Sequence, residues 1–181
     1  IEPDGISVSV GAEIGEVGHK NSTVEELRAF MDGYVPSLRR HGDHEGISKI
    51  SVQTGTSHGG VVLPDGSIAK VKLDLDALAA LSRVAREEYG MSGAVQHGAS
   101  TLPDDLFDRF PAAECAEIHL ATGFQNMLFD GGFLPDDLKA EMYGWLDANC
   151  ADEKKADMSA EQFHYKTRKK SYGPFKQQLF D

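Results

Sequence analysis

The chain has 181 residues, of which 40% are hydrophobic and 26% are charged, a composition typical of a globular domain with a proper core. Its formal net charge of −11 argues against a basic face that would track a nucleic-acid backbone, and no apolar run is long enough to span a membrane. Cys115 and Cys150 lack zinc-type spacing, so we expect both thiols to be reduced and the protein to be cytoplasmic.

The N-terminal segment predicts a strand followed by a helix. Residues 1–4 contain no initiator Met and no signal-peptide pattern, which favours a processed protein or a fragment over an intact product. Hydrophobic residues alternate with small ones over 6–10 and predict a strand that ends near Glu13. Ser22 and Glu25 form a capping box, which predicts that a helix begins there.

The middle of the chain continues this alternation. A second strand is expected over 47–52, ending before His58. Residues 61–68 contain an Asp-Gly pair typical of a hairpin turn. The clearest helix covers 75–88, where apolar residues recur at helical spacing, and Gly90 is its expected C-cap.

The remaining segments predict two more strands and several helices. The strands cover 93–96 and 117–121. The order β-α-β-α-β-α-β-α favours parallel pairing and an α/β fold. The helices are expected over 103–110, 123–129, 134–149 and 159–170.

Polar side chains lie at the carboxyl end of each predicted strand. Glu13 ends the first strand, His58 follows the second, His97 follows the third and Thr122 follows the fourth. In βα folds these ends converge, and imidazole with carboxylate suits Zn²⁺ or a similar divalent ion. A single His-Gly pair is typical of an ordinary turn, so both interpretations stay open on the residues alone.

The residues after the two histidines indicate a phosphate site. Gly59 and Gly98 leave backbone N–H groups unshielded by side chains. With the Ser100 hydroxyl and the start of the following helix, these groups could hold a phosphate.

Four segments together resemble the class II, metal-dependent fructose-bisphosphate aldolase family, which includes tagatose-bisphosphate aldolases. Residues 13–18 match the first half of the family's E-x-G-x-x-G-G-x-E-D pattern, and 55–59 match its G-x-x-H-G segment. Residues 97–101 resemble H-G-G/A-S-G, and 117–122 align with the last strand, K-x-N-x-x-T/D-T. The resemblance covers about residues 5 to 130.

By this resemblance the fold is a (βα)₈ TIM barrel, of which residues 1–133 supply the second half as about four βα units. Residues 134–181 are then a C-terminal helical extension. The family's remaining metal-binding His and its catalytic Asp belong to the first half, so no proton-transfer acid is assigned here. The first half is expected from the same protein or a second chain, in a homo-oligomer that binds no membrane and no nucleic acid.

The resemblance also implies roles for individual residues. A divalent metal, most simply Zn²⁺, would be bound by His58, His97 and Glu13. The phosphorylated sugar would contact Gly59, Gly98, Ser100, His119 and Thr122.

This chain departs from the family pattern in its last strand. His119 replaces the family's Asn, Ala121 replaces its Asp and Glu117 replaces its Lys. The acidic second half of the first motif is also absent after Gly18. These changes indicate a divergent member that uses another sugar phosphate or a related acceptor.

Two functions follow from these observations. The first is a metal-dependent aldolase-like lyase of carbohydrate metabolism, related to the glycolytic enzymes, that cleaves or condenses a phosphorylated ketose. The alternative is a non-catalytic barrel subunit that binds a sugar phosphate or a metal and has lost the chemistry. His119 and Ala121 favour the alternative, whereas His58 and His97 favour the enzyme.

Overall fold

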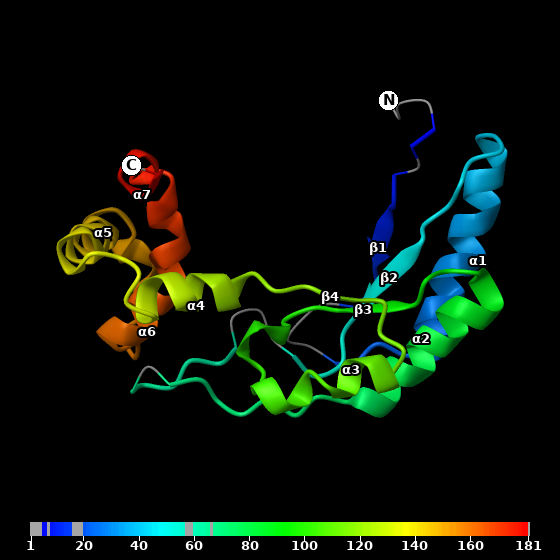
Figure 1. The fold of residues 1–181 in the computed structure, drawn as a ribbon, viewed down its shortest axis with the longest axis horizontal. Coiled ribbons are helices and arrows are strands. Elements are labelled where there is room, and N and C mark those ends of the chain that lie inside the picture. The colour runs from blue at the N-terminus through cyan, green and yellow to red at the C-terminus, as the bar shows by residue number, and fades with distance from the viewer. Residues whose placement is uncertain (1–4, 7, 16–19, 57–59, 66, 181) are drawn as a thin grey trace. The chain divides into compact units, whose positions relative to one another are not determined.

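The computed structural model describes residues 5–180 except positions 7, 16–19, 57–59 and 66. The chain forms two compact units, shown with all elements in Figure 1. The first unit contains 1–58 and 71–119, and the second contains 59–70 and 120–181. The predicted division at residue 133 separates a barrel from its extension, and it stays a prediction.

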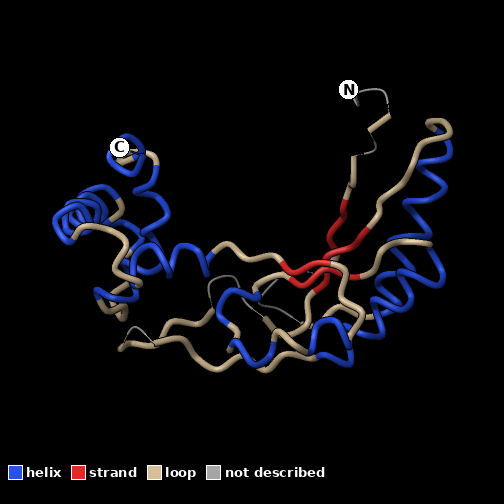
Figure 2. The backbone as a smooth tube through the Cα atoms, viewed as in Figure 1, coloured by secondary structure: helices blue, strands red, loops and turns tan. Residues whose placement is uncertain are grey.

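A four-stranded parallel sheet lies at the centre of the first unit (Figure 2). Its strands are β1 (Gly11–Glu13), β2 (Lys49–Val52), β3 (Ala94–Gln96) and β4 (Glu117–Ile118), and they lie in chain order. All three neighbouring pairs are parallel, which confirms the predicted α/β fold class with a parallel sheet.

The first and last strands are shorter than predicted. Pairing between β1 and β2 begins at Gly11, whereas Ile6, Val8 and Val10 are each more than half exposed. Their alternating pattern is that of a strand, but pairing with β2 covers only Gly11–Glu13, which make up the whole of β1. Pairing with β3 likewise ends β4 at Ile118.

Helices α1 (Val24–Arg40) and α2 (Leu75–Tyr89) pack against each other and against the sheet. Their apolar side chains pack on one face of β2 and β3. Side chains at alternate strand positions point toward this face. Gly90 ends α2 in the left-handed conformation, as predicted. The buried core of this unit includes Leu27, Met31, Ile50, Val52, Leu78, Leu81, Ala85 and Ala94.

The capping box of α1 lies one residue later than predicted. Thr23 accepts a hydrogen bond from the Glu26 backbone N–H, and Glu26 accepts one from Thr23. The Ser22 hydroxyl instead accepts from the Gln53 backbone N–H at 2.9 Å and donates to the carbonyl of Ile14 at 3.2 Å. Ser22 therefore ties the ends of β1 and β2 together and does not cap the helix.

The helix predicted over 103–110 is wrong in its position. The structure has a 3₁₀ turn at Asp104–Leu106 and a short α3 (Arg109–Ala112). Pro111 has no N–H and is best tolerated in the first turn of a helix, and it is the third residue of α3.

The second unit joins a hairpin to the C-terminal helices. Val62 pairs with Ile68 in antiparallel fashion, as in the predicted hairpin, whose turn residue Gly66 lies outside the described residues. Gln162 donates to the Val62 carbonyl at 2.8 Å. The segment predicted as a helix over 159–170 becomes 3₁₀ after Thr167. No helix among the described residues is long and apolar enough to cross a membrane. The helices are α4 (Thr122–Asp130), α5 (Asp136–Asn149), α6 (Ala160–Thr167) and α7 (Lys176–Phe180).

Candidate functional site

A polar row crosses the sheet on the face opposite α1 and α2. The strand register aligns Glu13, Ser51, Val95 and Glu117 across the four strands. Ile50 and its alternate neighbours face the core, so this row faces the other way. The sheet therefore presents two carboxylates and a hydroxyl, with the buried Val95 among them, on one side, and Ile50, Val52 and Ala94 on the other.

His97, directly after β3, lies at the centre of this face. Its Nδ1 lies 3.1 Å from Glu13 Oε1, and its Nε2 lies 3.0 Å from Ser51 Oγ and 2.9 Å from His119 Nδ1. Both ring nitrogens are thus engaged, so a metal ion bound through His97 has to displace one of these contacts. The structure brings together the predicted site residues Glu13, His97 and His119.

The network continues from His119 to the middle of the sheet. His119 Nε2 lies 3.0 Å from Glu117 Oε2, and the other oxygen of Glu117 accepts a hydrogen bond from Lys49 Nζ. Glu117 and Lys49 stand on β4 and β2, so their ion pair bridges over β3. Glu117, which replaces a Lys of the family, therefore holds His119 and carries a structural ion pair.

A buried polar layer supports the ends of β2 and β3. Gln96 donates to the carbonyl of His97 at 2.6 Å, and Thr56 donates to the same carbonyl at 2.7 Å. Thr54 donates to Gln96 at 2.5 Å, and all three side chains are buried. The sequence alone did not predict these supports, although Gln96 directly precedes His97 and both threonines come shortly before His58.

The turn that leads toward His58 is held by a close backbone contact. Gly55 has φ +98°, and a Cβ there would overlap the carbonyl oxygen of Lys72. Only glycine fits this position without strain. His58 and Gly59 themselves lie outside the described residues, so their predicted roles stay predictions.

The predicted phosphate-binding residues lie in two places. Gly98 has φ 68° and precedes a 3₁₀ turn at Ala99–Thr101, which contains the partly buried Ser100. Thr122 begins α4, in the second unit. Their contacts with a phosphate stay predictions.

The donor atoms of this face fit a divalent metal in their chemistry. Glu13 and His97 offer a carboxylate oxygen and an imidazole nitrogen, both common zinc ligands. Within residues 5–180, leaving out the positions not described, no three His, Cys, Asp or Glu side chains cluster as a metal site. The predicted third ligand, His58, lies outside the described residues.

The contacts of the Glu117 carboxylate make the stability of the fold depend on pH in the acid range. Hydrogen bonds from Lys49 and then His119 hold the pKa of Glu117 below its ordinary value of 4.5. A depressed folded-state pKa stabilises the fold above the unfolded pKa, and this stabilisation is lost as the pH falls through the folded pKa. Because the side chain is 39% exposed, solvent screening limits the effect to under about 1 kcal/mol.

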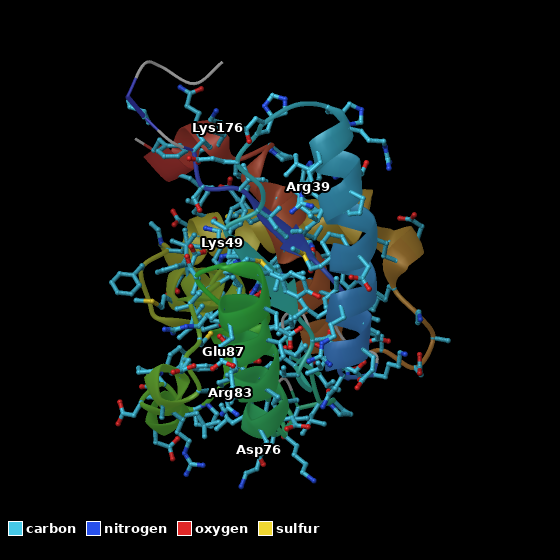
Figure 3. The ribbon with its side chains drawn as sticks, turned by 90° about the vertical axis from the view of Figure 1, so that its right-hand side faces the viewer. Arg39, Lys49, Asp76, Arg83, Glu87 and Lys176 are labelled. Atoms are coloured by element: carbon cyan, nitrogen blue, oxygen red, sulfur yellow. The ribbon has the colours of Figure 1, made fainter. Side chains whose placement is uncertain are left out.

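We therefore expect Glu117→Gln to lower the free energy of unfolding at about pH 7 but much less near pH 3.5. Urea titrations at both pH values measure this difference. The control is Glu87→Gln, on the exposed face of α2 (Figure 3), which should change little at either pH. A Glu117→Gln effect that is equal at both pH values would contradict the role given to this carboxylate.

Two comparisons with known proteins complete the description of the site. The family model described as fructose-bisphosphate aldolase class-II matches residues 4–172. The match spans all the residues predicted for the site. A comparison with individual curated proteins gives no match.

Proposed function

The chain belongs to the class-II fructose-bisphosphate aldolase family, and we propose that it forms the metal- and phosphate-binding side of an aldolase-like lyase. The reaction is retro-aldol cleavage or condensation of a phosphorylated ketose. The observation that carries this proposal is the contact of Glu13 with His97, 3.1 Å apart at the carboxyl ends of β1 and β3. Ligands and chemistry gather at these ends in βα barrels.

We also propose that the sheet is part of a (βα)₈ barrel. Its strands lie in chain order and all run parallel, as consecutive barrel strands do. A doubly wound sheet would instead reverse its strand order at a switch point. Four further strands would come from another segment of the protein or a second chain, in a homo-oligomer.

In this proposal Glu13, His58 and His97 hold Zn²⁺. The metal would supply a Lewis acid that polarises the carbonyl of the ketose. Ser51 and His119 contact Nε2 of His97 and orient its ring, as hydrogen-bonding neighbours of metal ligands do. The proton-transfer acid comes from the remaining part of the barrel.

The phosphate and the sugar are bound by the remaining predicted residues. The backbone N–H group of Gly98 and the Ser100 hydroxyl donate to phosphate oxygens, and Gly59 and Thr122 keep their predicted roles as phosphate-binding residues. His119 occupies the family's Asn position and contacts the ketose, and its ring is oriented by Glu117.

Two substitutions test these substrate roles. Ser100→Ala should leave the metal in place and weaken phosphate binding by roughly 1–3 kcal/mol, the cost of losing a hydrogen bond to a charged group. His119→Asn restores the family residue and should shift preference toward dihydroxyacetone phosphate. The measurements are metal content and kcat/KM for a set of phosphorylated ketoses.

Ser92→Ala is the matched control, because Ser92 is exposed just before β3. It should change neither metal content nor kcat/KM. If Ser100→Ala behaves like Ser92→Ala, Ser100 does not bind the phosphate. If His119→Asn leaves the substrate preference unchanged, the side chain at position 119 does not contribute to recognition of the ketose.

A further inference from the structure

The second unit contains a cavity that shares no residue with the proposed aldolase site. Its volume is about 420 Å³, within the range of about 300–1,000 Å³ typical of small-molecule sites. It lies between the hairpin and helices α4, α5 and α6, all within this unit. Its polar lining includes Ser67, Asn126, Asp130, Tyr143, Glu161 and Arg168.

Arg168 is the central group of this cavity, and it is only 2% exposed. Its Nη1 donates to both carboxylate oxygens of Asp130, at 3.1 and 2.9 Å, and its Nη2 donates to Asn126 Oδ1. Its Nε has no hydrogen-bond partner among the described residues. Asp130 and Asn126 together hold the guanidinium in place beside the cavity.

Aromatic rings form the apolar part of the same cavity. Tyr165 lies 4.3 Å from the Arg168 guanidinium, and the rings of Tyr143 and His164 stack with centroids 4.3 Å apart. Tyr165, Tyr143 and His164 all line the cavity. Burial raises the pKa of Tyr143, so its hydroxyl stays protonated at neutral pH and can both donate and accept.

The charges of the lining select against anions. Asp130 and Glu161 bring two carboxylates, whereas the one guanidinium, that of Arg168, is already paired with Asp130. His164 is paired with Asp147 at 2.9 Å and brings no uncompensated positive charge. A phosphorylated sugar would therefore meet net repulsion.

A simple amine also fits poorly, because a protonated amine cannot accept a hydrogen bond from the Arg168 guanidinium and is repelled by its positive charge. A hydroxyl group can donate a hydrogen bond to a carboxylate and accept one from the guanidinium. The edges of these aromatic rings offer apolar contact to the C–H groups of a sugar ring. We propose that this cavity binds a neutral polyhydroxy compound, such as an unphosphorylated monosaccharide.

The test titrates the full chain with glucose, galactose, fructose and myo-inositol, using saturation-transfer NMR and calorimetry. Fructose 6-phosphate and spermidine serve as anionic and cationic probes. We expect saturable binding of at least one neutral compound, and at least tenfold weaker binding of both charged probes to this cavity. Saturation only by spermidine or only by the phosphate would overturn the proposal, as would no saturable binding by any neutral compound.

Two variants locate the binding. Ser67→Trp places a large ring at the cavity wall, and Glu161→Gln weakens one acceptor on an exposed helix turn. Each should lower the affinity for the neutral compound at least tenfold, with the fold verified by circular dichroism. Leu63→Trp, on an exposed hairpin position outside the cavity lining, should leave it unchanged.

Neutral-sugar binding that survives Ser67→Trp unchanged would place the site elsewhere and overturn the proposal. This inference does not depend on the aldolase proposal. Loss of retro-aldol activity would not affect sugar binding in the cavity, and the reverse also holds.

Discussion

The variant His97→Ala is expected to lose most of its bound divalent metal and at least about a hundredfold in retro-aldol turnover. Loss of a residue that only orients a metal ligand costs roughly 10- to 100-fold, so loss of a ligand should cost more. His97 is also the residue that joins Glu13, Ser51 and His119. Metal analysis of the assembled protein and turnover of a phosphorylated ketose measure the two losses.

The matched control is His44→Ala. His44 lies exposed in the loop between α1 and β2, where its ring contacts the carbonyl of His41 at 3.0 Å. It should keep full metal content and full turnover. If His97→Ala keeps its metal content and turnover, the metal ligands lie elsewhere. We expect His58→Ala to lose metal and turnover as His97→Ala does.

A second large effect is expected from Gly55→Ala, which should lower the free energy of unfolding by roughly 2–4 kcal/mol. The new Cβ would overlap the Lys72 carbonyl oxygen, and φ +98° is strained for any residue with a side chain. Because both partners of the overlap are backbone or close to it, a rotamer change cannot relieve it. Urea denaturation measures the loss.

Gly33→Ala is the control for this substitution. Gly33 lies inside α1, and a Cβ there would meet nothing within 4 Å. Alanine in a helix interior should stabilise the protein by about 0.5–1 kcal/mol. A Gly55→Ala variant as stable as the parent would mean that residues 54–56 do not run against Lys72 as described.

Local periodicity was sufficient to predict the elements that carry strong patterns. The helix α2 has apolar residues at helical spacing and a glycine after its last turn, so its position was predicted within a residue or two. The predicted capping box of α1, Ser22 with Glu25, is wrong by one residue, because Thr23 and Glu26 form it. The Ser22 hydroxyl is instead bonded to the Gln53 backbone, 31 residues away, and local sequence does not contain this contact.

The part of the candidate site that depends only on the ends of parallel strands could be predicted from the sequence. Glu13 and His97 meet because both stand at carboxyl ends of parallel strands. The contacts of Lys49 with Glu117 and of Ser51 with His97 depend on the register between strands. A pattern of alternation gives the face of a residue but not its partner across the sheet, so these contacts were missed.

The cavity of the second unit could not be predicted for a similar reason. Its lining combines Ser67 and Ile68 of the hairpin with residues about 60 to 100 positions later. The hairpin is tied to the C-terminal helices by Gln162, which donates to the Val62 carbonyl. Only the tertiary arrangement brings these segments together.

The most direct test of the aldolase-like function combines metal loading with cleavage of phosphorylated ketoses by the assembled protein. We predict about one divalent ion per chain, with retro-aldol cleavage that stops on chelation and returns when Zn²⁺ is added. A folded, metal-loaded assembly that cleaves none of these ketoses would contradict the account and favour a non-catalytic barrel subunit.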